Sequence, residues 1–353
     1  MTDVPLHPLP THPATLPWPT PVWPEGDLSA VVTDKRLRRF HALTELCSSS
    51  DGRAQIGDTH ALVVINHGRL VFENYGPGKS ASDTFPSWSM AKSITHALIG
   101  IAVRDGLINI NDRIPVPEWD DPADPRHALT WDQLLRMSSG LDWMEAYVPG
   151  QPSDVIEMLF GENALADTGS YAAKKPLVHA PGSHWYYSSG TTNILARALG
   201  DILGGGLGAI HDFMFEELFD KIGMSSPKPI LDKVGTFVGS SFCYCTPRDF
   251  ARFGYLYLRD GIWEGRRLLP EGWVDYARTP TPQPETEELG YGAHWWLNMC
   301  GPHSFSANGF LGQYTVIRPD LDLIIVRHGH SETDEQKDGV QAWLAELADC
   351  FKD

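Results

Sequence analysis

The sequence predicts an α/β (α+β) fold in which one sheet is built from both ends of the chain. Near the start, "HALVVINHGRLVFENYG" (residues 60–76) contains two β-rich runs separated by His67–Gly68, which is a hairpin signal. Near the end there are three more strand-like runs, "YGAHWWLNM" (291–299), "QYTVIRP" (313–319) and "LDLIIVRHG" (321–329). Between these ends the sequence consists mostly of helical patches and loops.

These patterns divide the chain into three parts. Residues 1–30 are rich in proline and are expected to run as an extended segment along the surface. Residues 31–106 and 235–353 are expected to form one discontinuous α/β sheet domain. A mainly helical region, residues 107–234, is inserted into that domain.

The helices of the sheet domain have recognisable starts and ends. One helix is expected near residues 34–47, and another follows Ser89, where apolar residues repeat at helical spacing until Gly106 stops the helix. "TPRDFARFGYLYLRDG" predicts a third helix, because Thr246 is a natural N-cap and is followed by a proline at the first helical position. A last helix is expected near residues 335–350.

The composition and charge exclude several classes of partner. Hydrophobic residues make up 42% of the chain and charged residues 21%, as in ordinary globular proteins. The 28 basic and 45 acidic side chains give a net charge of −17, which argues against nucleic acid and membrane surfaces as partners. No apolar run is long enough to span a membrane. The sequence does not fix the oligomeric state.

The cysteines and the first residues favour a cytoplasmic protein. Five cysteines, an odd number without a disulfide-like framework, indicate reduced thiols. Cys243 and Cys245 would share one face of a strand, but two such residues are too few for a zinc site. His328 and His330 share a strand face as well, and without a third ligand they are expected to be surface histidines rather than metal ligands. The start lacks a basic region and is broken by prolines, so it is not a signal peptide.

"SWSMAKSITHALIGIAVRDG" (87–106) places a serine and a lysine at the start of a helix. Residues three positions apart are helix neighbours, so Ser89 and Lys92 can touch. A serine there can attack a carbonyl while its own N–H helps to hold the oxyanion, and a desolvated lysine can take its proton. The spacing alone fits a helix-capping serine and a surface lysine better. Ser225–Lys228 has the same spacing, but Pro227 excludes a helix, so that copy is a loop.

Tyr187 lies in "PGSHWYYSSGTTNIL" (181–195), a loop that runs into a helix. Beside a lysine ammonium its phenolate would be stabilised, and Ser, Lys and Tyr together can carry a proton from nucleophile to leaving group. Taken alone, Tyr187 fits a buried aromatic residue with one satisfied hydroxyl better, and Tyr186 next to it fits the same pattern.

Gly309 and Gly312 enter a strand in "SFSANGFLGQYTVIRPDLDLIIV" (304–326). Glycines at such positions let a backbone approach a ligand closely, and an edge strand there could offer a second oxyanion N–H. In isolation, a β-bulge or turn explains the two glycines better.

Taken together and in this order, these segments resemble the penicillin-recognising serine hydrolases. That group includes class C β-lactamases, D-alanyl-D-alanine carboxypeptidases, family VIII esterases and 6-aminohexanoate-dimer hydrolases, the last being the nearest branch. The resemblance runs from about residue 55 to 350 and also includes "LTWDQLLRMSSGLDW" (129–143) and "CTPRDFARFGYLYLRDGIWEGRRLLPEGWV" (245–274). It implies a β-lactamase/transpeptidase-like fold, with an antiparallel sheet flanked by helices and an inserted mainly helical region.

The resemblance also implies roles for individual residues. Ser89 would be the nucleophile, Lys92 its general base, and Tyr187 the second base and acid. The N–H groups of Ser89 and Phe310 would form the oxyanion hole. Further candidates for substrate binding or for pocket walls are Ser189, Asn308, Gly309, Tyr291, Trp295 and Trp296, although core packing explains the aromatic residues equally well. This chemistry requires no metal and no organic cofactor.

Two departures from the family pattern bear on the substrate. The third position of the family's Tyr-x-Asn motif is Ser189, and its Lys/His-Thr-Gly motif falls on Ala307–Asn308–Gly309, which carries no cation. β-Lactamases use that strand motif in binding the drug's carboxylate, so its loss argues against efficient penicillin hydrolysis.

The resemblance therefore implies a serine hydrolase that cleaves small carboxylic esters or amides through an acyl-enzyme on Ser89. The pocket is expected between the sheet-bearing and helical regions. A D-alanyl-D-alanine carboxypeptidase or weak β-lactamase would use the same residues on other substrates. An inactive binding or scaffold protein is the alternative that is not an enzyme.

Overall fold

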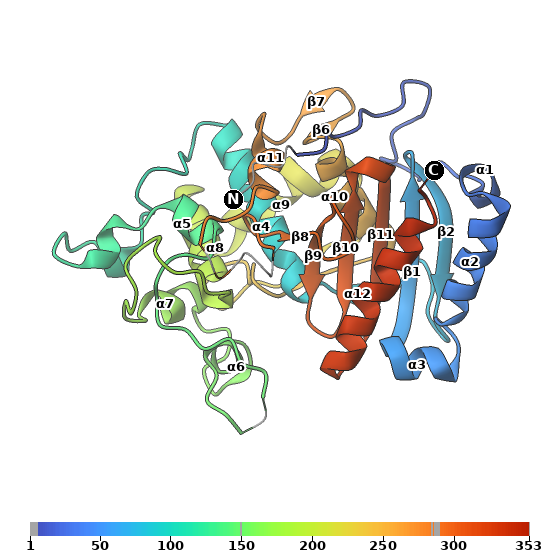
Figure 1. Ribbon diagram of the computed structural model, residues 1–353. Helices are drawn as coiled ribbons and strands as arrows, with labels where there is room; N and C mark the ends of the chain where they lie inside the picture. The colour runs from blue at the N-terminus through green and yellow to red at the C-terminus, as the bar shows by residue number, and fades with distance from the viewer. Residues whose placement is uncertain (1–5, 149, 284, 286–289, 353) are drawn as a thin grey trace.

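A six-stranded antiparallel sheet in the order β2-β1-β11-β10-β9-β8 joins the two ends of the chain (Figure 1). The computed structural model describes residues 6–148, 150–283, 285 and 290–352. The prediction of a sheet built from both ends is confirmed. Its strands are β1 (Asp58–Asn66), β2 (Arg69–Tyr75), β8 (Trp296–Leu297), β9 (Phe305–Gly309), β10 (Gln313–Arg318) and β11 (Leu323–His330).

Alternating side chains give the sheet two apolar faces. Leu62 and Val64 of β1 pack in the core that holds α2 (Asp34–Glu45) and α12 (Asp334–Asp349). Val63 and Ile65 point the other way, into the core that holds α4 (Ala91–Arg104) and α10 (Pro247–Leu258). Figure 1 shows α12 in front of the sheet and α10 behind it. Helices therefore cover the sheet on both sides.

The local signals at the first hairpin and at α10 are confirmed. Asn66 pairs with Arg69 across a two-residue turn in which His67 and Gly68 have φ of 47° and 75°. This is the left-handed geometry that a tight hairpin needs. Helix α10 begins after Thr246, whose side chain accepts a hydrogen bond from the backbone N–H of Asp249.

The middle of the chain forms the mainly helical region on the left of Figure 1. Its α-helices are α5 (Trp131–Leu135), α6 (Asp154–Phe160), α7 (Thr168–Ala173), α8 (Ser189–Ile202) and α9 (Gly206–Met214). Helix α4 lies between this region and the sheet, and its residues from Ala91 to Ala102 are all buried. A helix that is buried on every side forms the centre of a domain. The start of α4, where Ser89 lies, is thus held from both regions.

The remaining elements are short. They are α1 (Leu28–Val31), α3 (Ser50–Ile56), α11 (Trp273–Ala277) and the β6–β7 pair (Ile262–Trp263 and Arg266–Arg267). A small second sheet, β3-β5-β4, consists of Phe85–Pro86, Cys243–Cys245 and Lys228–Pro229. The second Ser-x-x-Lys copy is not helical, as its prolines predicted, but its Lys228 lies in the short strand β4 rather than in a loop. No helix in the described part of the chain combines the length and apolarity needed to cross a bilayer.

The prediction that Cys243 and Cys245 share a strand face is confirmed, whereas the prediction for His328 is wrong. All five cysteines are free thiols, and the Sγ atoms of Cys243 and Cys245 lie 3.7 Å apart on one face of β5, as the alternation predicted. The expectation of surface histidines is wrong for His328. Its ring is fully buried, with centroid distances of 5.0 Å to Phe85 and 4.9 Å to Phe250. The centre of β11 is covered on both faces, so a histidine there becomes part of the core.

Candidate active site

Ser89 lies in a 3₁₀ turn, η1 (Trp88–Met90), immediately before α4. Ser87 ties this turn to β5, because its N–H donates to Cys243 O at 3.2 Å and its Oγ accepts from Cys243 N at 2.9 Å. Trp88 has a φ of +45°, a left-handed conformation that is strained for a bulky side chain. The surrounding contacts hold this strained turn and present Ser89 at the N-terminus of a buried helix.

Lys92 lies one turn further along and points back at Ser89. Its Nζ is 3.0 Å from Ser89 Oγ, 3.0 Å from Ser189 Oγ and 2.9 Å from the carbonyl oxygen of Ser240. The side chain is almost wholly buried. Burial lowers the pKa of Lys92 to about 8, against the charge of Glu145, which raises it. A large share of Lys92 is therefore neutral in mildly alkaline solution and able to accept a proton.

Tyr187, rather than Tyr186, faces this pair. The Nζ atom of Lys92 lies 4.7 Å from the centroid of the Tyr187 ring. Tyr186 points outward and is 43% exposed. Burial and the charge of Glu145 raise the pKa of Tyr187, and the influence of the Ser89 side chain, which lowers the pKa, only partly opposes them. The expected phenolate is therefore not stabilised, and Tyr187 is a neutral phenol that can donate its proton.

The end of β9 lies against the turn that carries the nucleophile. A Cβ on Gly309 would lie 2.3 Å from the Ser87 carbonyl oxygen and 3.1 Å from Trp88 Cβ. Only glycine allows this approach, which also brings the rings of Phe310 and Trp88 within 5.4 Å. The backbone of Phe310 is thus next to the turn of Ser89.

Two of the candidate substrate-binding residues point elsewhere. Ser189 is fully buried behind Lys92 and has no exposed atom to offer a substrate. The side chain of Asn308 donates from Nδ2 to Met299 Sδ at 2.9 Å, and Met299 packs in the core on the α12 side of the sheet. Neighbouring strand residues face opposite sides, so Asn308 points away from the face that Gly309 presents to Ser89.

The aromatic candidates divide between the site and the core. Trp296 is half-buried, and its ring centroid lies 5.4 Å from that of Tyr187. Tyr291 is buried behind it, with its ring edge-on to Tyr187 at 6.0 Å. Trp295 points the other way and packs on Tyr257 at 4.4 Å inside the main core, so it is not a pocket wall.

Comparison with known proteins shows the family of the chain. The family model "Beta-lactamase" matches residues 57–349, which is most of the chain. The chain belongs to the β-lactamase family. This membership indicates a hydrolase, and it confirms the resemblance that the ordered motifs suggested.

Individual relatives of this β-lactamase-family chain are distant. It is 23% identical to a 6-aminohexanoate-dimer hydrolase from Paenarthrobacter ureafaciens over 325 residues, which cover 82% of this chain and 77% of the relative. A Bacillus anthracis structure provisionally described as a 6-aminohexanoate-dimer hydrolase superposes with a TM-score of 0.73 at 21% identity, covering 97% and 90% of the two chains. A penicillin-binding protein from Bacillus halodurans gives 0.64 at 15% identity, covering 85% and 97%. These likenesses establish the β-lactamase/transpeptidase-like fold.

Glu145 belongs to the candidate site of this β-lactamase-family chain, but the sequence did not indicate it. Glu145 Oε1 accepts from Ser189 Oγ at 2.6 Å, while Oε2 accepts from Ser189 N at 2.8 Å and from Trp143 Nε1 at 2.6 Å. Glu145 follows the segment 129–143 in an irregular stretch, and 44 positions separate it from Ser189. No helical or strand spacing connects the two residues, so only the folded chain brings them together.

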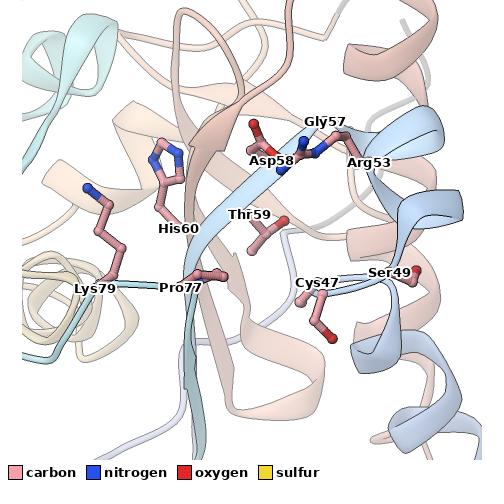
Figure 2. A pocket seen from close by; sticks show the side chains of 11 residues that line it. Cys47, Ser49, Arg53, Gly57, Asp58, Thr59, His60, Pro77 and Lys79 are labelled. Carbon is pink, nitrogen blue, oxygen red and sulfur yellow. Dashed lines mark ion pairs between the residues drawn. The ribbon is translucent and has the colours of Figure 1, made fainter.

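A separate cavity of about 240 Å³ lies beside the first strands and is lined by residues between Cys47 and Lys79. Figure 2 shows Arg53 and Asp58 paired at its rim, with Cys47 and His60 among the lining residues; the ion pair is 2.7 Å long. Burial raises the pKa of the Cys47 thiol to about 11, so it stays protonated. The Cys47 thiol is therefore not an activated nucleophile.

Proposed function

We propose that this β-lactamase-family chain is a serine hydrolase that cleaves small carboxylic esters or amides through an acyl-enzyme on Ser89. The observation that carries the proposal is the contact of 3.0 Å between Ser89 Oγ and Nζ of the buried Lys92. A lysine can serve as general base only if desolvation makes its neutral form accessible, and the lowered pKa of Lys92, about 8, meets this requirement.

In the first half-reaction, neutral Lys92 takes the hydroxyl proton of Ser89 while Oγ forms a bond to the substrate carbonyl carbon. The negative charge that develops on the carbonyl oxygen is held by the N–H groups of Ser89 and Phe310. The bond to the leaving alcohol or amine then breaks. Tyr187 gives its proton to the leaving group and regains one from protonated Lys92, which leaves an ester on Ser89.

In the second half-reaction, water attacks the ester carbonyl and Lys92, neutral again, removes a proton from the water through Tyr187. The same two N–H groups hold the oxyanion. The bond to Ser89 Oγ breaks, Oγ takes back the proton, and the carboxylic acid leaves. Atoms and protons balance without any other group.

The uncharged strand beside Ser89 supports esters and small amides over β-lactams. Ala307 is buried and offers no cation to a drug's carboxylate. The relative from Paenarthrobacter ureafaciens is named for an amide, the 6-aminohexanoate dimer, and this supports linear amides as substrates here. A carboxypeptidase or β-lactamase activity is the alternative; turnover of nitrocefin well above that of p-nitrophenyl butyrate would favour it.

Labelling with a fluorophosphonate probe tests the nucleophile. We expect wild type to label and Ser89→Ala not to label. Ser225→Ala is the matched control, because it alters the other Ser-x-x-Lys copy at an exposed position, and it should label like wild type. Failure of wild type to label, or equal labelling of Ser89→Ala, would overturn the proposal and favour a binding or scaffold protein. A panel of small esters and amides, with Ser89→Ala as blank, then defines the substrate.

A further inference from the structure

A buried chain of hydrogen bonds runs from the general base to a carboxylate. Lys92 Nζ donates to Ser189 Oγ at 3.0 Å, and Ser189 Oγ donates to Glu145 Oε1 at 2.6 Å. We propose that Glu145 and Ser189 are positioning residues that aim the lone pair of Lys92 at Ser89. This inference rests on the proposed function, because it assigns how the proposed base is oriented.

The direction of the Ser189 hydroxyl follows from what surrounds Glu145. An ionised carboxylate can only accept hydrogen bonds. Glu145 accepts from Ser189 N, from Trp143 Nε1 and, at 3.4 Å, from the hydroxyl of Tyr147. The hydroxyl hydrogen of Ser189 must therefore point at Glu145. Ser189 Oγ can then only accept a further hydrogen bond, and the group that donates to it is the Nζ amine of Lys92.

The orientation of Lys92 then follows by elimination. A neutral amine has two hydrogens and one lone pair, and Lys92 Nζ has three oxygen neighbours. The carbonyl oxygen of Ser240 can only accept, at 2.9 Å, and Ser189 Oγ has its own hydrogen committed. Both amine hydrogens are thus used, and the lone pair is left for the third neighbour, Ser89 Oγ. Without Glu145, the Ser189 hydroxyl could rotate and donate to that lone pair, in competition with Ser89.

The carboxylate also acts on the charge of the base. Among the described residues, three titratable groups near Lys92 bear on its charge: Tyr187, the buried His294 and Glu145. Burial lowers the pKa of His294 to about 3, so this ring is neutral, and Tyr187 is a neutral phenol. Glu145 is therefore the one charged group of the three, and its charge raises the pKa of Lys92. Neutralising it should make Lys92 a weaker base with a lower pKa.

This arrangement also explains the serine at the third position of the tyrosine motif. An asparagine there has a separate acceptor, its amide oxygen, and separate donors. A serine has one oxygen for both purposes, so a second group must hold its hydrogen. In this chain Glu145 is that group.

A double-mutant cycle tests whether Glu145 acts through Ser189. We expect Ser189→Ala and Glu145→Gln each to lower kcat/KM for p-nitrophenyl butyrate by about 10- to 100-fold, in the range of a misaligned general base. If Glu145 acts through Ser189, the double variant should be no slower than the slower single variant. Additive losses would overturn the proposal. Ser189→Asn should regain most of the rate, because its amide can accept from Lys92 and donate to Glu145.

The pH profile gives a readout that a purely structural role would not change. The acid limb of kcat/KM should move to lower pH in Glu145→Gln and stay in place in Glu145→Asp, which keeps the charge. Ser188→Ala is the matched control, since its hydroxyl caps α8 by accepting from Thr191 N at 3.0 Å. It should lower thermal stability without moving the limb. If the acid limb of kcat/KM does not move in Glu145→Gln, the positioning role of Glu145 is overturned. Fluorophosphonate labelling of Ser89 would still support the proposed function in that case. If Glu145→Gln fails to fold, Ser189→Ala with a wild-type rate overturns it instead.

Discussion

Gly309 and Ser87 lie so close together that a methyl group on Gly309 would be 2.3 Å from the Ser87 carbonyl oxygen. This contact fixes the end of β9 against the turn of Ser89 and thereby the distance between the two proposed oxyanion donors. Gly309→Ala should push the Phe310 N–H away from the oxyanion and lower kcat by about 100- to 1,000-fold, which is the usual effect of losing one donor. Steady-state turnover of p-nitrophenyl butyrate measures this.

A second glycine in the same molecule provides the control. A Cβ on Gly200, inside α8, would meet only Ile210 Cβ at 3.9 Å, an ordinary contact. Gly200→Ala should keep wild-type turnover and gain up to about 1 kcal/mol of stability, since alanine is the better helix former. If Gly309→Ala keeps the wild-type kcat, the close approach of Gly309 to Ser87 does not determine the geometry of the oxyanion hole.

The lowered pKa of Lys92 predicts the pH dependence of the reaction. The base must be neutral in the free enzyme, and its pKa is about 8. The value of kcat/KM should therefore rise about tenfold per pH unit below that value and level off above it. Lys92→Arg should remove this activity, because a guanidinium does not lose its proton in this range. A profile that is flat between pH 6 and 9 would contradict Lys92 as the base.

Much of the fold could be predicted because its signals are local. The turn at His67–Gly68, the cap at Thr246 and the stop at Gly106 each act within a few residues, and the structure has them where the sequence indicated. The Ser89–Lys92 contact could be predicted for the same reason, since both residues lie within one helical turn.

The features that could not be predicted depend on contacts between distant segments. Glu145 meets Ser189 only because an irregular stretch folds over the start of α8. The direction of the Asn308 side chain depends on the strand register, and a shift of one residue would reverse it. The raised pKa of Tyr187 arises from burial, and burial is a property of the assembled core.

If Tyr187 donates the proton, the loss of rate on removing its hydroxyl should depend on the leaving group of the substrate. Tyr187→Phe removes the hydroxyl that would supply this proton. The value of kcat/KM reports the acylation step. It should fall by about 100-fold or more for an amide or alkyl ester, whose leaving atom needs a proton, and much less for a p-nitrophenyl ester, whose leaving anion is stable. Tyr186→Phe, at the exposed neighbour, is the control and should leave both rates unchanged. Equal losses on both substrates would contradict the acid role.

His328 predicts a loss of stability in acid. Burial, with the charge of Arg327, lowers the pKa of His328 to about 3, and its Nε2 has no hydrogen-bond partner among the described residues. In the unfolded chain the ring has its ordinary pKa, near 6.5. The unfolded state therefore binds a proton first as the pH falls, so the stability present above about pH 6.5 is lost progressively toward pH 3.

Replacing His328 by phenylalanine should remove this part of the acid sensitivity. The new ring can stack on Phe85 and pack at a tilt against Phe250 as the imidazole does, and Gln313 Oε1 keeps its bond from Gly329 N at 3.2 Å. Between pH 7 and 5 the free energy of unfolding should fall by about 2 kcal/mol less in His328→Phe than in wild type, since each pH unit below 6.5 is worth about 1.4 kcal/mol. Urea unfolding at the two pH values measures the difference. If both proteins lose the same free energy, the buried ring is already protonated at pH 5 or is not the group that titrates.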